Sequence, residues 1–298
     1  MKQAKSNRKK WFGYTLYAIL LGIGLLYYMF PSDAVKDYLE TFARKVNPNF
    51  LLTVGKVRPS FWFGLTFEDA TLSHKAHPRA RLLLADTLLI RPVVWSFLYG
   101  KGRYRFAGRA YDGEVRGSLH FEGNRMGGPF NTSIELKGIS IDDSTSVSAL
   151  IGRSVRGILD GTITYSGQQN LFLKGTGEAD LRVSDGRVEL LNPILTFDSI
   201  DFNEVLVKMV LRNQKVDITH AELKGRDIGG TLSGTVSLNK DFLKSSLNLR
   251  GVLEPFAGLL KGDKGAATTV KLLAQRLKGG RASFTIRGTL AEPKIKFI

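Results

Sequence analysis

The chain is dominated by a two-residue alternation of apolar and polar positions that begins near residue 51. In residues 171–183, every odd position carries Leu, Gly, Ala or Val, and most even positions carry a charged or hydroxyl side chain. A period of two is typical of antiparallel strands that bury one face and expose the other to solvent. About a dozen such runs are separated by turn residues, so the sequence predicts an all-β fold for residues 49–298.

The apolar positions of these runs predict one shared face of the sheet. The residues that we assign to it, as a candidate apolar groove, are Val115, Leu119, Phe121, Leu171, Leu173, Leu232, Val236, Leu238, Phe284 and Ile286. Two arrangements fit such a face. Either the curved sheet is filled by its own side chains, or the face forms a trough that stays open to a lipid chain.

Glycine is placed inside these runs as well as between them. A short motif of an apolar residue, then Lys or Arg, then Gly recurs between residues 115 and 288, and its glycine shares a face with the apolar residue. A glycine on the inner face of a strand permits sharp curvature. The glycines to which we assign this role are Gly117, Gly138, Gly175, Gly234, Gly251 and Gly288.

Residues 11–30 form a different pattern, a run without a charged side chain. As an α-helix this run spans roughly 30 Å, the hydrocarbon thickness of a bilayer. The basic residues that precede it predict a cytoplasmic N-terminus. A cleaved signal peptide fits less well, because no small-residue cleavage site follows, and a buried core helix needs no basic flank. The residues assigned to this membrane anchor are Trp11, Tyr14, Leu16, Leu20, Leu25, Tyr27, Tyr28 and Phe30.

The chain therefore divides into four expected parts, which are a basic cytoplasmic tail (1–10), a transmembrane helix (11–30), a helical neck (31–48) and a β-rich domain (49–298). The neck has apolar residues at helical spacing, so it is either a stalk leading out of the membrane or an ordinary first helix of the domain. Further short helices are expected at residues 93–99, 144–151 and 268–278.

Composition narrows the range of functions. The 43 Lys and Arg residues against 27 Asp and Glu give a formal net charge of +16, which attracts polyanions of any kind. Nucleic acid is not the expected partner, because the Lys and Arg residues are spread along many strands and not clustered on one face. The chain has no cysteine and none of the common nucleophile, zinc or phosphate-loop motifs. We therefore expect no enzymatic activity, no metal and no cofactor.

Several stretches resemble known protein families. The N-terminal anchor and the segments ADTLLIRP (85–92) and FAGRAYDGEVRG (106–117) look like the protein N component of the bacterial type II secretion system. The segments SDGRV (184–188), GGTLSG (229–234) and IRGTLAEPK (286–294) are similar to the wider AsmA-like group. These motifs are loose patterns of glycine and apolar residues, and no catalytic residue comes with them.

The resemblance implies a single-pass protein of the bacterial inner membrane with a periplasmic domain, built as a curved, taco-like antiparallel sheet with a few short helices. It implies a non-enzymatic accessory role in type II secretion, with apparatus subunits as partners. AsmA-like proteins are associated with handling lipid between membranes, so the alternative is a lipid-binding or lipid-transfer module of the cell envelope. The partners expected on this basis are membrane lipids, secretion subunits and a lipid ligand held in the groove.

Overall fold

The computed structural model describes ten stretches of the chain, which are residues 4–46, 50–60, 63–74, 77–123, 128–141, 154–194, 197–225, 228–239, 241–255 and 281–298. Their helical elements are α1 (Ala4–Tyr28), α2 (Ser32–Val46), α3 (Val94–Leu98) and the 3-10 helices η1 (Gln169–Lys174) and η2 (Phe242–Lys244). The strands are β1 (Phe50–Thr53), β2 (Lys56–Ser60), β3 (Gly64–His74), β4 (His77–Pro92), β5 (Gly102–Ala110), β6 (Gly113–Phe121), β7 (Pro129–Ile141), β8 (Val155–Gln168), β9 (Thr176–Ile194), β10 (Phe197–Arg212), β11 (Lys215–Gly225), β12 (Ile228–Ser237), β13 (Ser246–Pro255), β14 (Ala282–Thr289) and β15 (Pro293–Phe297).

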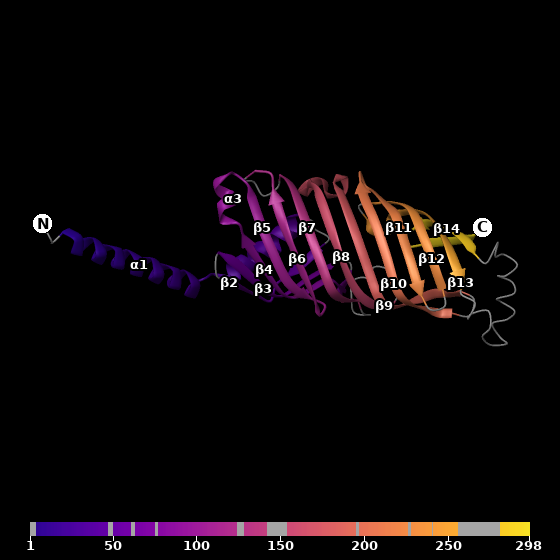
Figure 1. Cartoon of the computed structure of the whole chain (residues 1–298), viewed down its shortest axis with the longest axis horizontal. Helices are drawn as coiled ribbons and strands as arrows, with labels where there is room; N and C mark the ends of the chain where they lie inside the picture. Colours follow the sequence, from indigo (N-terminus) through magenta and orange to yellow (C-terminus); the bar gives the residue numbers. More distant parts are fainter. Residues whose placement is uncertain are drawn as a thin grey trace.

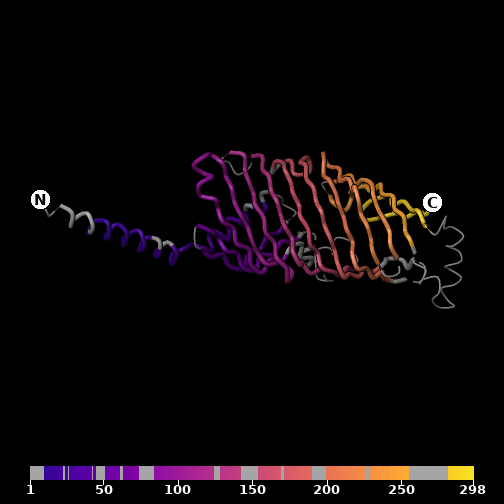
Figure 2. Tube along the Cα trace, viewed as in Figure 1, coloured from indigo at the N-terminus to yellow at the C-terminus, as the bar shows by residue number. Residues whose placement is uncertain are grey.

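All of these strands belong to one antiparallel sheet. From β3 onward each strand pairs with the next in the sequence, while β1 and β2 both pair with β3. The strands run across the long axis of the molecule, with α1 leaving at one end and the C-terminus lying at the other (Figure 1). The trace advances along this axis in sequence order (Figure 2). The predicted antiparallel all-β class with few helices is confirmed.

The register between strands keeps apolar residues in line across the sheet. One row of directly paired residues, called the central row below, crosses every strand from β2 to β15. Its members are Val57, Phe67, Leu88, Gly108, Val115, Leu136, Gly161, Leu181, Val207, Ala221, Leu232, Gly251, Phe284 and Phe297. None of them is polar, so the sheet has one apolar face along its whole length.

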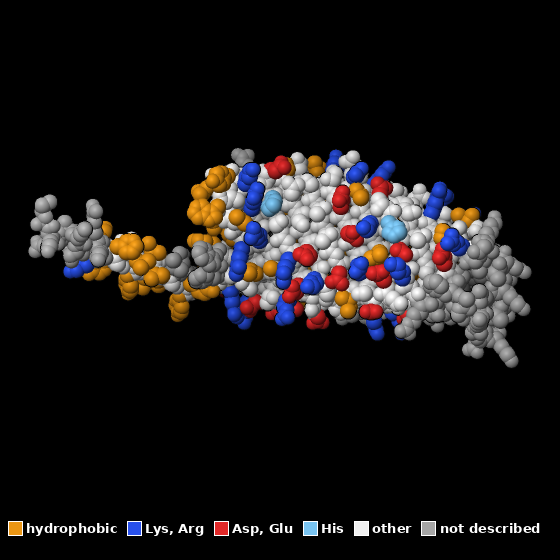
Figure 3. Space-filling model, in the orientation of Figure 1, with side chains coloured by type: hydrophobic (Ala, Val, Ile, Leu, Met, Phe, Trp, Pro, Cys, Tyr) orange, Lys and Arg blue, Asp and Glu red, His pale blue; other side chains and the backbone are white. Residues whose placement is uncertain are grey.

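The opposite face carries the charged side chains (Figure 3). Most members of the central row are only half-buried, although they are apolar. The chain exposes 20640 Å² of surface, whereas a compact monomer of its mass exposes about 12,500 Å². The exposed side chains of α1 and the half-buried members of the central row contribute to this surface.

The well-packed core lies at the end of the sheet that follows α1. Val54, Val57 and Phe67 are buried there, and Val35 and Leu39 of α2 pack against them. Helix α2 has an apolar stripe at helical spacing and an acidic residue, Asp33, in its first turn, which favours the helix dipole. Helix α2, which lies within the expected neck, therefore packs against the first strands of the sheet.

Several inner-face glycines accommodate an aromatic ring from the neighbouring strand. A Cβ added at Gly117 would lie 2.4 Å from the Phe106 ring and 2.3 Å from a backbone carbonyl oxygen of β7. Gly251 is overlaid in the same way by Phe284, and Gly175 by Tyr165. The room that these glycines provide is thus taken by the protein's own rings, an arrangement that stabilises glycine within sheets.

The other three curvature glycines have a different role. Gly138, Gly234 and Gly288 have φ angles of 63°, 134° and 101°, which side chains of L-residues rarely adopt. Gly138 lies within the irregularity between Leu136 and Ile139, where the register of β7 with β8 shifts. These glycines therefore permit bends and bulges of the backbone.

The structure differs from the sequence analysis at residues 171–174. The alternation predicts a strand from Leu171, but Leu171 and Leu173 lie in η1 and the strand begins at Thr176. Within this turn the Tyr165 hydroxyl donates a hydrogen bond to the Phe172 carbonyl oxygen at 2.6 Å. The helix expected at residues 93–99 is present as α3, whereas those expected at 144–151 and 268–278 lie outside the described residues.

The ring-over-glycine arrangement predicts a position-specific effect on stability. Gly117→Ala is expected to lower the free energy of unfolding by about 1–3 kcal/mol, because the new methyl group overlaps a ring and a carbonyl oxygen. Gly102 on the same strand pair is the matched control, since a Cβ there would lie 3.6 Å from Phe121, an ordinary contact. Urea unfolding monitored by circular dichroism measures both variants, and equal losses would contradict the arrangement.

Candidate functional site

The apolar face brings together most of the residues assigned to the candidate groove. Val115, Leu232 and Phe284 lie in the central row, and Ile286 lies in the adjacent row. Leu119 and Val236 share a third row, and Phe121 lies next to it on β6. Leu238 follows the end of β12, and Leu171 and Leu173 lie in η1, outside these rows.

These residues line a long surface and not a single pocket. The central row crosses thirteen strand spacings of about 4.8 Å, which gives a length of roughly 60 Å. A parallel row two residues along the strands is equally apolar. Its members from β2 to β15 are Pro59, Leu65, Ile90, Phe106, Gly117, Ile134, Ile163, Ala179, Met209, Ile218, Gly234, Leu249, Ile286 and Ile295.

Aromatic rings form a continuous strip at one margin of the apolar face. The rings belong, in order from α3 to η1, to Phe97, Tyr104, Phe121, Phe130, Tyr165 and Phe172. Successive ring centroids are 5.8, 6.1, 6.0, 5.5 and 4.5 Å apart, within the range of favourable aromatic pairs. The sequence analysis singled out Phe121 alone. The signal for the others was the recurrence of an aromatic residue near the same end of successive strands.

The polar side chains within this region carry no charge. Burial raises the pKa of the Tyr104 and Tyr165 hydroxyls above the ordinary value, so both are uncharged near neutral pH. Thr132 interrupts the third apolar row, but its hydroxyl donates a hydrogen bond to the Ser118 carbonyl oxygen at 3.0 Å. The strip and its surroundings therefore offer an apolar surface without a free charge.

The polar face is organised by ion pairs between neighbouring strands. Asp180 pairs with Lys208 at 3.1 Å, and Glu204 pairs with both Arg182 at 3.0 Å and Lys224 at 2.9 Å. The hydrogen bond from Lys224 lowers the pKa of Glu204. These pairs are exposed and contribute little stability each. In the described part of the chain, no three His, Asp or Glu side chains are grouped to hold a metal ion.

The residues assigned to the anchor lie in two different settings. Seven of them, from Trp11 to Tyr28, lie on α1 with exposed side chains, whereas Phe30 packs against the core beside α2. Among the described residues, no helix combines the length and apolar character required to cross a bilayer.

The Tyr165 hydrogen bond gives a test of how the aromatic strip is held. Tyr165→Phe keeps the ring but leaves the Phe172 carbonyl without this donor, so the free energy of unfolding is expected to fall by about 1 kcal/mol. Tyr104→Phe is the control, because in the described structure its hydroxyl has no hydrogen-bond partner, and its change is expected to stay within about 0.5 kcal/mol. Chemical denaturation measures both, and identical stabilities of the two variants would refute the assignment.

Comparison with known proteins leaves the family of the chain undetermined. No protein-family model matches the sequence, no curated protein matches it, and no solved structure matches the fold. The resemblance to protein N of the type II secretion system and to the AsmA-like group therefore stays a prediction.

Proposed function

We propose that the protein is a non-enzymatic, membrane-anchored lipid-binding protein of the bacterial cell envelope, whose apolar sheet face holds acyl chains. The observation that carries the proposal is the central row, which places apolar residues or glycine on fourteen consecutive strands and leaves most of them half-exposed. Soluble monomers rarely expose contiguous apolar patches larger than a few hundred Å². A face of this length therefore calls for a ligand or a partner.

The chemistry of the face favours an acyl chain over a protein. Protein interfaces carry roughly one hydrogen bond per 100–200 Å², which requires accessible donors and acceptors. All members of the central row are apolar residues or glycine, and the Thr132 hydroxyl of the third row is already bonded to a backbone carbonyl. A hydrocarbon chain needs no polar partner and gains about 0.8 kcal/mol for each CH₂ group that is removed from water.

The anchor completes the proposal and rests on the full sequence of residues 11–30. This run has no charged residue, and it includes Ile23 and Leu26, whose side chains lie outside those described. The basic residues before it favour a cytoplasmic N-terminus. In this arrangement α1 crosses the inner membrane, and the sheet lies in the periplasm, where it binds lipid supplied by the membrane.

Site-specific photo-crosslinking tests the proposal in the intact chain. A photoreactive benzoylphenylalanine is introduced at Leu181 of the central row, in cells whose phospholipids carry radioactive phosphate. Leu206 on the neighbouring strand is the matched control, because it lies on the polar face opposite Arg182. We expect a labelled adduct at position 181 and none at 206.

The same experiment identifies the alternatives. Absence of lipid adducts at position 181, and also at Val207 and Leu232, would mean that the face does not hold lipid in the cell. Adducts to a protein at these positions would assign the face to a partner subunit instead. Equal labelling at 181 and 206 would show non-specific exposure to membrane lipid, and the proposal would fail.

A role as an accessory component of type II secretion is the second candidate. The edge of β15 that faces away from β14 has no neighbouring strand in the described residues, and such an edge accepts a strand from a partner. If the protein serves secretion, deletion of its gene is expected to reduce export by the type II pathway, and apparatus subunits are expected to co-purify with the full chain. Normal export together with the absence of such subunits would remove this candidate.

A further inference from the structure

Helix α3 forms an exposed apolar tip at one margin of the sheet. It connects β4 to β5. Trp95 and Leu98 on the helix and Tyr99 at its C-cap are 74, 73 and 80% exposed. Phe97 contacts Tyr104, the second ring of the aromatic strip, at a centroid distance of 5.8 Å. The tip therefore adjoins one end of the apolar face.

Hydrogen bonds hold this tip in place. The buried Ser96 hydroxyl donates to the Val93 carbonyl oxygen at 2.6 Å and accepts the Arg103 amide hydrogen at 3.2 Å. The Val93 amide donates to the Arg103 carbonyl oxygen at 2.8 Å, and the Lys101 amide donates to that of Ser96 at 3.0 Å. The large apolar side chains are thus presented to solvent by a well-anchored turn.

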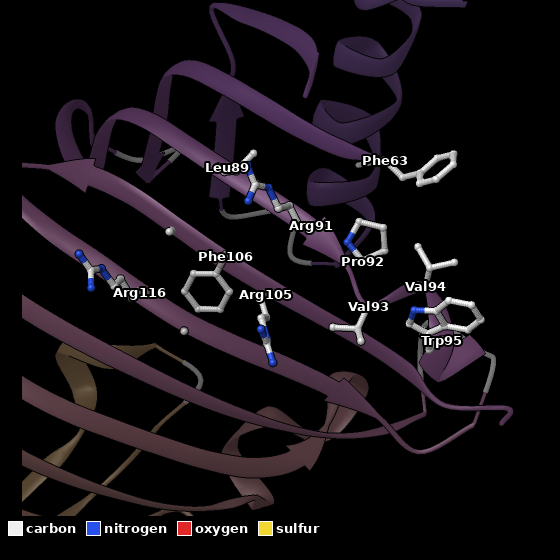
Figure 4. A pocket seen from close by; sticks show the side chains of 12 residues that line it. Phe63, Leu89, Arg91, Pro92, Val93, Val94, Trp95, Arg105, Phe106 and Arg116 are labelled. Carbon is white, nitrogen blue, oxygen red and sulfur yellow. The ribbon is translucent and has the colours of Figure 1, made fainter. Parts of the chain in front are cut away.

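A hollow of about 720 Å³ lies beside the tip and combines apolar and cationic side chains. Phe63 and Trp95 line its outer end, and Arg91 and Arg105 lie further in (Figure 4). Phe63 is 78% exposed and has a φ angle of 60°, an unusual conformation for a bulky residue. Among the described residues, Arg91 and Arg105 form no ion pair, so their charges are available to an anion.

The tip lies at the end of the molecule where the proposed membrane anchor begins. Helix α1 leaves the sheet at the same end of the molecule that carries α3 (Figure 1). The space-filling view shows apolar side chains gathered on α3, with Lys and Arg side chains next to them (Figure 3). Trp and Tyr favour the level of the headgroups, and Arg pairs well with phosphate.

We propose that this tip is a second membrane contact, in which Phe63, Trp95, Leu98 and Tyr99 insert into the interface of a bilayer that contains anionic phospholipid. Arg91 and Arg105 then pair with headgroup phosphates. The inference rests on the membrane anchor proposed above, because α1 keeps the tip close to the bilayer. It also gives the apolar face an entrance, since the aromatic strip that begins at Phe97 would open at the membrane surface.

Two variants of the full chain, each with a single tryptophan, test the proposal in reconstituted vesicles. Trp11→Phe with Trp62→Phe leaves Trp95 of the tip, and Trp62→Phe with Trp95→Phe leaves Trp11 of the anchor. The vesicles contain phosphatidylglycerol and phospholipids brominated along the acyl chain, which quench tryptophan on contact. We expect quenching and blue-shifted emission for both tryptophans.

The outcomes separate the inference from the function on which it rests. Quenching of Trp11 without quenching of Trp95 would overturn the second contact and leave the anchor intact. Absence of quenching at both positions would overturn the anchor and the tip together. Blue-shifted but unquenched emission from Trp95 would show that the tip is covered by protein and not by lipid, which also overturns the proposal.

The role of the arginines has its own test. The double variant Arg91→Gln with Arg105→Gln is made in the chain that retains only Trp95. It is expected to lower the equilibrium constant for binding of the tip to the anionic vesicle surface by about 30-fold, which is measured as a loss of Trp95 quenching. Arg250→Gln with Arg287→Gln is the control, because it removes the same charge from neighbouring exposed positions on β13 and β14, far from the tip along the sheet. An equal effect of both pairs would refute specific contacts with headgroups.

Discussion

The structure depends on strand register, because register alone keeps the apolar residues of successive strands on one face. A slip of one residue moves all side chains of a strand to the other face. The sequence does not keep a strict period of two, since register shifts occur between Leu136 and Ile139 and between Ile218 and Ala221. Each shift changes which positions face inward, so that apolar residues on both sides of it join the same face. The local irregularities therefore preserve the continuity of the central row.

Among the described residues, α2 is the helix that covers the first strands of the apolar face. Packing is dense where α2 covers the first strands, and beyond that point the apolar face is stabilised mainly by contacts between neighbouring strands. Aromatic rings lying over Gly117 and Gly251 make the surface smoother and less hollow than the glycines alone would suggest. The result is a long, half-exposed hydrocarbon-like surface, for which an acyl chain is the chemically simplest cover.

The three proposals about lipid form one physical arrangement. In the proposed arrangement, the charge-free run of α1 would place the domain at a bilayer and the tip at α3 would touch the interface. The aromatic strip leads from the tip along the apolar face. Each proposed contact is stabilised because it removes apolar surface from water, and the arginine side chains are expected to pair with lipid headgroups. The opposite face carries exposed ion pairs and is solvated. The two faces of the sheet therefore differ in chemistry, one being apolar and the other charged.

The sequence by itself determined the all-β class, the helical character of Ser32–Val46 and which positions within most strands share a face, because these follow from local periodicity. It could not place residues 171–174, where the alternation continues through η1 but the chain forms a turn to which the Tyr165 hydroxyl is bonded. It also could not reveal the ring-over-glycine pairs, the aromatic strip or the hollow beside Phe63 and Trp95. Those features depend on register, bulges and hairpin geometry, which bring together residues that lie far apart in the sequence, and only the tertiary structure decides them.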